Sequence, residues 1–232
     1  MEGTTRDPTL ADGPGARADI TSGETGRRRF ERADSNGSVV EIKPITADPG
    51  PLGLAAFALT TFVLSFFNSG LMSEKGLPIV LGLALAYGGL AQLLAGMWEF
   101  RTGNTFGATA FTSFGAFWLS FWAFEQFFAK DITDKTALAH SVGLFLIGWG
   151  IFTAYMFVAS LRVSVAVAVV FALLAVTFIL LGIGDATETE GITHAGGFIG
   201  IATAIAAWYA SFAAVTNSTF GRTVLPVKEL NR

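Results

Sequence analysis

The chain has 232 residues, 52% of them hydrophobic, with a mean hydropathy of +0.55 and a formal net charge of −3. It contains no cysteine, which excludes disulfides, thiolate catalysis and cysteine-ligated metals. Residues 49–232 carry only 17 charged side chains in 184 residues. Such a composition cannot cover a water-soluble globule, but it suits a polytopic membrane protein with about six spans of about 20 residues each.

The N-terminal segment, residues 1–47, is rich in glycine, serine, threonine and charged side chains. It cannot bury enough apolar surface to offset the entropy of ordering, so we predict a disordered cytoplasmic tail. The arginines at positions 27–29 could alternatively contact anionic lipid headgroups.

Six apolar segments follow and predict six transmembrane helices. Asp48 is a suitable N-cap for the first helix, and Pro49 fits its first position. The fold class is therefore an all-α membrane protein, a compact six-helix bundle over residues 48–226 followed by a short cytoplasmic tail at 227–232. The predicted spans are approximately 54–67, 77–98, 106–128, 140–161, 165–183 and 194–215.

Six spans place both termini on one side of the membrane. Five cationic residues fall on that side and three lysines on the other, which favours cytoplasmic termini. The first group is Arg101, Arg162, Arg222, Lys228 and Arg232; the second is Lys75, Lys130 and Lys135. We expect a multi-pass protein of the cell (plasma) membrane.

A polar seam joins the second and third spans with almost no loop, from Gln92 to Gly107. Gln92 and Glu99 are seven residues apart and thus share one helix face. A buried Gln92 amide needs partners, either a neighbouring helix or a solute carboxylate. Glu99 fits either a salt bridge with Arg101 or a proton-exchanging carboxylate in a substrate vestibule.

The third span begins just after this seam. Asn104 or Thr105 can cap it, leaving N–H groups and a positive dipole end that attract anions. Asp48 has the opposite effect on anions at the start of the first span, because its negative charge repels them from that helix end.

Glu125 lies late in the third span. We interpret it as a headgroup-level charge with Trp118 and Trp122 beside it in the aromatic belt.

The sequence gives no sign of catalysis. With only two histidines, a multi-haem or copper enzyme is improbable, and no span contains a lysine for a retinal Schiff base. There is no phosphate loop, nucleophile elbow or zinc motif. We expect no enzyme activity, cofactor, metal or nucleic-acid partner.

Three motifs give the chain a specific resemblance. Residues 51–54 read Pro-Leu-Gly-Leu, residues 87–113 run from Tyr-Gly-Gly-Leu-Ala-Gln through Gly-Asn-Thr-Phe-Gly to Ala-Phe-Thr-Ser, and residues 220–226 read Phe-Gly-Arg-Thr-Val-Leu-Pro. With them the chain resembles the acetate uptake transporter family, which includes bacterial succinate–acetate permeases and yeast and fungal acetate transporters, over about residues 48–226.

The resemblance implies a six-helix protomer, usually in a homohexameric ring, with one substrate path per protomer. It implies transport of acetate and, in several relatives, succinate or other short monocarboxylates, by proton-coupled symport or channel-like passage. The family's narrow apolar constriction falls on Phe57, Phe114 and Leu174. Its second-span glutamine and glutamate fall on Gln92 and Glu99, and its first-helix asparagine on Asp48.

Two positions depart from the family pattern. Phe114 replaces a tyrosine and so removes a hydroxyl from the constriction, while Asp48 replaces an asparagine and adds a negative charge at one mouth. We therefore expect weaker attraction of anions where Asp48 is ionised.

Three functions stay open from the sequence. The first is transport of short-chain carboxylates, acetate first, with protons as partner and Gln92, Glu99, Asn104, Thr105 and Asp48 in the vestibule. The second is a passive channel for small neutral solutes (acetic acid, ammonia, urea). The third is a membrane sensor that uses the N-terminal tail as its output.

Overall fold

The structure is a computed structural model that describes residues 20–22, 28–33, 39–41 and 46–230. In the N-terminal part it contains three short antiparallel strands: β1 (Ile20–Ser22), β2 (Arg28–Ala33) and β3 (Val39–Glu41). The register pairs Ile20 with Phe30 and Glu31 with Glu41. The disordered tail predicted for residues 1–47 stays a prediction, because most of residues 1–45 lie outside the described residues.

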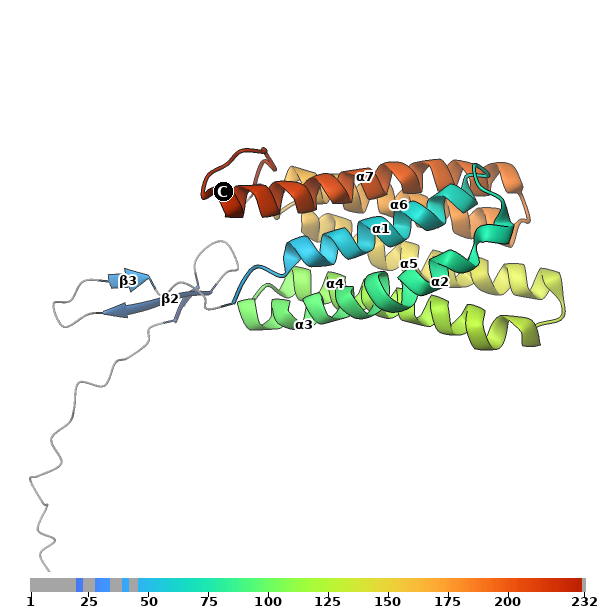
Figure 1. The fold of residues 1–232 in the computed structure, drawn as a ribbon, viewed down its shortest axis with the longest axis horizontal. Helices are drawn as coiled ribbons and strands as arrows, with labels where there is room; N and C mark the ends of the chain where they lie inside the picture. Colours follow the sequence, from blue (N-terminus) through green and yellow to red (C-terminus); the bar gives the residue numbers. More distant parts are fainter. Residues whose placement is uncertain (1–19, 23–27, 34–38, 42–45, 231–232) are drawn as a thin grey trace, which may run out of the picture.

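The remaining described chain forms an all-α bundle (Figure 1). Six long helical rods run back and forth along one axis, and α2 and α3 form a single rod joined by a π-helical turn. The helices are α1 (Gly50–Asn68), η1 (Glu74–Gly76), α2 (Pro78–Leu85), η2 (π turn, Ala86–Ala91), α3 (Gln92–Thr102), α4 (Thr105–Ala123), η3 (π turn, Phe124–Phe128), η4 (Ala129–Asp131), α5 (Lys135–Ser160), α6 (Val165–Ala186) and α7 (Glu190–Phe220).

Five of these rods are long and apolar enough to cross a membrane: Gly50–Asn68, Pro78–Thr102, Lys135–Ser160, Val165–Ala186 and Glu190–Phe220. The sixth, α4, has 19 residues and packs along α3. The all-α fold class predicted from the sequence is confirmed, and the protein is a multi-pass membrane protein.

Several helices are longer than the apolar segments indicate. The sequence placed helix starts near residues 140 and 194, but α5 begins at Lys135 and α7 at Glu190. The reason at α5 is a polar cap, because Asp134 Oδ1 accepts hydrogen bonds from the backbone N–H groups of Thr136 and Ala137 at 3.0 and 3.1 Å. A helix can thus extend past its apolar part wherever a cap satisfies its free N–H groups.

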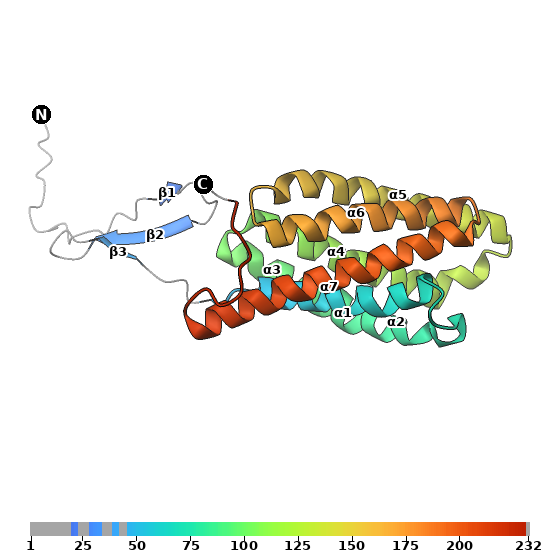
Figure 2. The same ribbon diagram turned by 90° about the horizontal axis from the view of Figure 1, so that it is seen from above.

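Packing within the bundle is mainly between α7 and its neighbours α1 and α6, between α5 and α6, and between α3 and α4 (Figure 2). Small residues allow the closest approach of α3 and α4. A Cβ added at Gly96 would lie 2.3 Å from Thr112 Oγ1 and 2.5 Å from its backbone nitrogen, so only glycine fits there.

The C-terminal segment folds back on the bundle. The Asn217 side chain accepts hydrogen bonds from the N–H groups of Val224 and Leu225 and donates one to the carbonyl of Leu225, all within 2.9 Å. Tyr209 donates a hydrogen bond to the carbonyl of Pro226 at 2.7 Å. The motif at residues 220–226 is therefore an ordered segment that turns back and is hydrogen-bonded to α7; we call it the C-terminal return.

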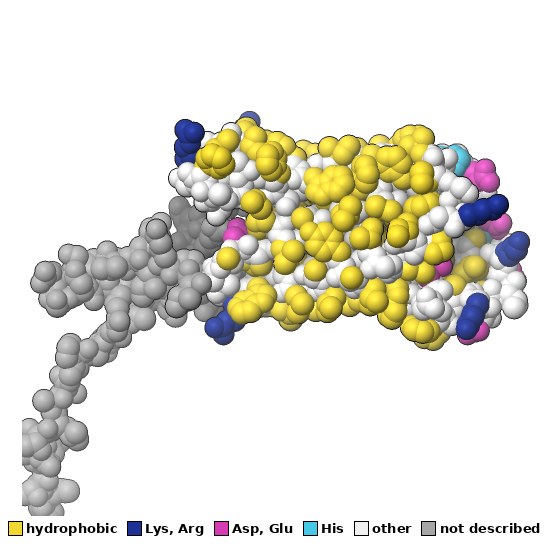
Figure 3. Space-filling view, viewed as in Figure 1, with side chains coloured by type: hydrophobic (Ala, Val, Ile, Leu, Met, Phe, Trp, Pro, Cys, Tyr) yellow, Lys and Arg dark blue, Asp and Glu magenta, His cyan; other side chains and the backbone are white. Residues whose placement is uncertain are grey.

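The polarity of the surface changes along the bundle axis. Figure 3 shows an apolar middle with charged side chains gathered at the two ends. We call the end that holds the start of α1 and the end of α7 the terminal end, and the opposite end the distal end. Arg101, Arg162, Arg222 and Lys228 follow or end helices at the terminal end, and Lys75, Lys130 and Lys135 lie at the distal end, as the predicted topology requires.

Candidate functional site

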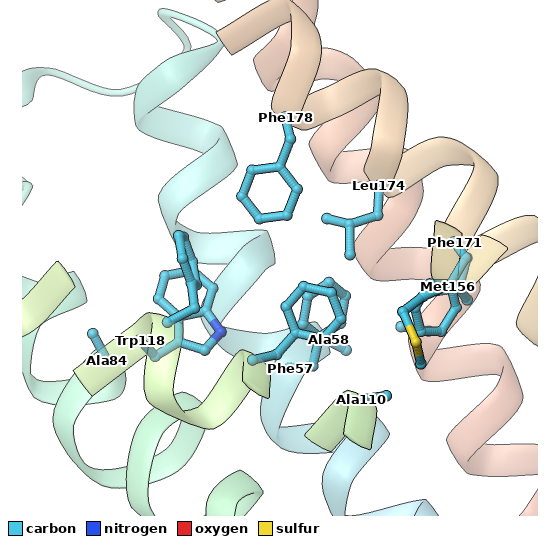
Figure 4. Packing of buried hydrophobic residues seen from close by; sticks show 13 residues of the cluster. Phe57, Ala58, Ala84, Ala110, Trp118, Met156, Phe171, Leu174 and Phe178 are labelled. Carbon is cyan, nitrogen blue, oxygen red and sulfur yellow. The ribbon is translucent and has the colours of Figure 1, made fainter. Parts of the chain in front are cut away.

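The three residues of the predicted constriction lie in one buried cluster. Phe57, Phe114 and Leu174 are 4%, 3% and 3% exposed and come from α1, α4 and α6. The rings of Phe57 and Phe114 have centroids 5.7 Å apart. Phe152, Phe171 and Phe178 pack around Phe114 from α5 and α6. The centre of the bundle is therefore a closed apolar plug (Figure 4), which we call the belt.

A cavity of about 440 Å³ extends from the belt to the distal end, and we call it the distal cavity. Phe57 and Leu174 line its deep part, Glu125 lines it from the π turn η3 after α4, and Asp185 lines it from the end of α6. Between them the walls are mostly apolar, with Phe117, Phe121, Phe145, Leu146, Phe178 and Leu181. A small solute with an apolar body fits such walls.

Gln92 and Glu99 are both buried, at 0% and 1% exposure, so the heptad spacing predicted their shared face correctly. Among the described residues, neither atom of the Gln92 amide has a hydrogen-bond partner. An amide buried in this way is costly, so it calls for a bound partner such as water or a solute.

The height of this amide in the bundle follows from its neighbours. Leu93 packs against Gly115, where an added Cβ would lie 2.6 Å from the Leu93 backbone nitrogen. Gly115 directly follows Phe114, so Gln92 lies at the height of the belt. The π turn Ala86–Ala91 immediately precedes Gln92, and such turns often occur at functional sites.

The other seam residues form a cluster at the terminal end. Thr102 Oγ1 donates a hydrogen bond to Glu99 Oε2 at 3.1 Å, and Asp48 Oδ1 accepts one from the N–H of Gly50 at 2.9 Å. A Cβ added at Gly50 would lie 3.1 Å from Asp48 Oδ1 and 3.4 Å from Glu99 Oε1. Both carboxylates therefore border the same small space.

Asn104 completes this terminal cluster of Asp48, Glu99, Thr102 and Asn104. It caps α4 as predicted, since its Oδ1 accepts a hydrogen bond from the N–H of Gly107 at 3.1 Å. A Cβ at Gly107 would lie 2.5 Å from Asn104 Nδ2 and 2.7 Å from Glu99 Cδ, which places Asn104 and Glu99 beside one another. Thr105, by contrast, is exposed at the first position of α4.

Sequence reasoning missed part of the cavity lining. Trp118, interpreted as an aromatic-belt residue at the headgroups, is instead 2% exposed and packs edge-to-face on Phe117 and Phe121. Asp185 lies two residues beyond the fifth span predicted at 165–183, but it belongs to the last turn of α6. Thr61 also lines the cavity but gave no sequence signal, because a threonine in an apolar helix usually bonds within its own helix.

Comparison with known proteins finds relatives whose names refer to acetate transport. The chain is 44% identical to acetate permease A of Emericella nidulans over 195 residues, covering 78% of this chain and 65% of the relative. It is 42% identical to the succinate-acetate/proton symporter SatP of Escherichia coli K12 over 183 residues, covering 79% of this chain and 96% of SatP. The chain thus spans less than two thirds of the fungal relative's length and nearly all of the bacterial one.

A solved structure agrees with these relatives. The structure described as that of the bacterial acetate channel SatP superposes with a TM-score of 0.73 at 41% identity, covering 78% of this chain and 99% of that one. These relatives are a permease, a symporter and a channel, so they are transport proteins and not enzymes. Since residues 36–232 match the GPR1/FUN34/yaaH family, the chain belongs to that family of membrane transport proteins.

Proposed function

We propose that this protein moves short-chain carboxylates, acetate first, across the cell membrane through a path inside each protomer. One observation carries the proposal: the Gln92 amide, which has no hydrogen-bond partner among the described residues, lies at the height of the belt, between the terminal cluster and the distal cavity. The names of the relatives, an acetate permease and a succinate-acetate symporter, support acetate and add succinate as a second substrate.

The residues along this path have separate roles. Asp48, Glu99, Asn104 and Thr105 form the vestibule at the terminal end, which collects and orients the carboxylate. Phe57, Phe114 and Leu174 form the constriction, where a carboxylate must shed water and one of the rings must move. The Gln92 N–H donors offset part of that dehydration, because they hydrogen-bond the carboxylate at the narrowest point.

Three further features belong to the same proposal. The first is that acetate moves together with protons, which the name of the Escherichia coli relative, a succinate-acetate/proton symporter, supports. The protomers assemble into a homohexamer, and both termini face the cytoplasm. The domains are the N-terminal tail (1–47), the transport domain (48–226) and the short C-terminal segment (227–232).

Reconstitution of the full chain in proteoliposomes tests the function. Labelled acetate should enter vesicles at a rate above that of protein-free vesicles, and excess unlabelled succinate should reduce it. An imposed inward proton gradient should drive accumulation above equilibrium. Uptake equal to that of protein-free vesicles would refute transport and favour the sensor, whereas uptake without accumulation would refute proton coupling.

Gln92→Leu separates a binding role from a structural one. Removing a buried amide that has no hydrogen-bond partner in the described part of the chain should leave the melting temperature unchanged or raise it, because the desolvation cost disappears. Acetate uptake should nevertheless fall by about tenfold, the equivalent of one lost hydrogen bond to a charged group of about 1.5 kcal/mol. Unchanged uptake would exclude a Gln92 contact with the substrate.

A further inference from the structure

Two carboxylates stand at corresponding positions on two helices of the distal cavity. Glu125 follows the belt residue Phe114 by eleven residues, and Asp185 follows the belt residue Leu174 by the same interval. Eleven residues of α-helix make about three turns, so Asp185 lies on the same side of α6 as Leu174 and about 16 Å from it. Glu125 lies in the π turn η3, which directly follows α4. Both side chains line the cavity at its distal end.

The surroundings of these carboxylates are also acidic. Among the described residues, the lining of the distal cavity contains no lysine, arginine or histidine. The distal end as a whole holds seven carboxylates and three lysines, with His140 and His194 at the starts of α5 and α7. The carboxylates are Glu74, Glu125, Asp131, Asp134, Asp185, Glu188 and Glu190, and the lysines are Lys75, Lys130 and Lys135. An anion that approaches this cavity therefore meets charge of its own sign.

The floor of the same cavity offers hydrogen-bond donors. Trp118 and Thr61 line it at 2% and 6% exposure, and among the described residues neither Trp118 Nε1 nor Thr61 Oγ1 has a hydrogen-bond partner. In Figure 4 the indole nitrogen of Trp118 faces the side on which Phe57 lies. Buried donors without an acceptor are rare in proteins, so these two indicate a bound acceptor next to the belt.

We propose that the distal cavity is a binding site for the un-ionised carboxylic acid, in which Glu125 and Asp185 exclude the free anion at the mouth and Trp118 and Thr61 bind the carbonyl oxygen at the floor. The site rests on the proposed function, because it names the form in which the substrate of that path is admitted at the distal end.

The chemistry of an un-ionised acid matches each part of this cavity. Its carbonyl oxygen accepts from the Trp118 N–H, its alkyl part contacts the phenylalanine and leucine walls, and it carries no charge for Glu125 and Asp185 to repel. The acid keeps its proton while it is bound in this cavity, so one proton enters with each acetate without a relay through the side chains that line the cavity. Proton-coupled uptake then follows from the selectivity of the mouth.

A pair of solutes tests this site, namely acetate and its uncharged isostere acetamide, each supplied at neutral pH to proteoliposomes that contain the full chain. Glu125→Gln combined with Asp185→Asn should raise the ratio of acetate flux to acetamide flux about tenfold, because the acetate anion is then no longer repelled at the mouth. Tenfold is about the lower limit of the effect that a charged cleft has on the rate at which ions enter it. Glu74→Gln combined with Glu190→Gln is the matched control, since it removes two distal charges outside the cavity lining. The control should leave the ratio unchanged.

Substitutions of the two hydrogen-bond donors should change both fluxes but leave their ratio constant. Trp118→Phe and the nearly isosteric Thr61→Val should each lower acetate and acetamide flux together, because both solutes present a carbonyl oxygen, and the ratio should stay constant. An unchanged ratio in the Glu125/Asp185 variant, or an equal rise in the control, would overturn the anion exclusion. Unchanged flux in both donor variants, with melting temperatures like the wild type, would overturn the floor site. Wild-type protein that moves neither solute would instead refute the proposed function itself.

Discussion

A single methyl group at Gly107 should disrupt the terminal cluster. Gly107 lies in the first turn of α4, and its added Cβ would approach Asn104 Nδ2 at 2.5 Å and Glu99 Cδ at 2.7 Å. Both distances are well below van der Waals contact. In Gly107→Ala, either the Asn104 cap or the Glu99 carboxylate must therefore move away from its present partner.

The size of the effect follows from overpacking. Inserting a methyl group into a tightly packed site costs about 1–3 kcal/mol. If Glu99 and Asn104 orient the substrate, we expect their displacement to cost the same free energy in substrate binding. Acetate uptake should then become about 5-fold to 150-fold less efficient, since each 1.36 kcal/mol is a factor of ten.

The assay is acetate uptake per folded protein in proteoliposomes, together with the melting temperature in detergent. Gly82→Ala and Gly148→Ala are matched controls, because a Cβ at either glycine meets no atom within 4 Å. Both controls should retain wild-type uptake. If Gly107→Ala lowers the melting temperature while its uptake equals that of the controls, the terminal cluster takes no part in transport.

Three other changes give distinct outcomes. Phe114→Leu removes ring contacts from the belt and should raise succinate flux relative to acetate while destabilising the protein by about 0.5–3 kcal/mol; an unchanged ratio would show that the belt does not select by size. Asp48→Asn removes a negative charge from the terminal mouth and should increase acetate uptake at neutral pH, so an unchanged rate and pH profile would contradict a role for that charge. Asn217→Ala loses three hydrogen bonds to the C-terminal return and should lower stability by about 1–3 kcal/mol in thermal melts, with uptake preserved at low temperature; a melting curve identical to the wild type would show that the return does not stabilise the bundle.

Local patterns in the sequence were enough for the helices and for part of the site. Apolar segment length predicted the rods, and the heptad spacing of Gln92 and Glu99 predicted their shared buried face. The Asn104 cap was predictable because its side chain bonds to a backbone N–H three residues away. Each of these depends on contacts within one or two turns of helix.

The distal cavity was not predictable in the same way, because its walls come from several helices that are distant in sequence. The aromatic side chain of Trp118 fits a membrane interface as well as a protein core, and the packing of neighbouring helices decides between the two. Asp185 illustrates the same limit, since an acidic residue after an apolar segment resembles a loop residue until the helix is seen to continue.

The π turn at Ala86–Ala91 has a consequence for the direction of the site residues. A π turn accommodates about one more residue per turn than an α-helix, and one residue corresponds to a rotation of about 100° and a rise of about 1.5 Å. If the same residues were wound as an uninterrupted α-helix, the whole of α3 would rotate about its axis relative to α2 and carry Gln92 and Glu99 away from α1 and α4 together. The buried orientation of both side chains therefore depends on the π turn before them, which accommodates one surplus residue without rotating α3.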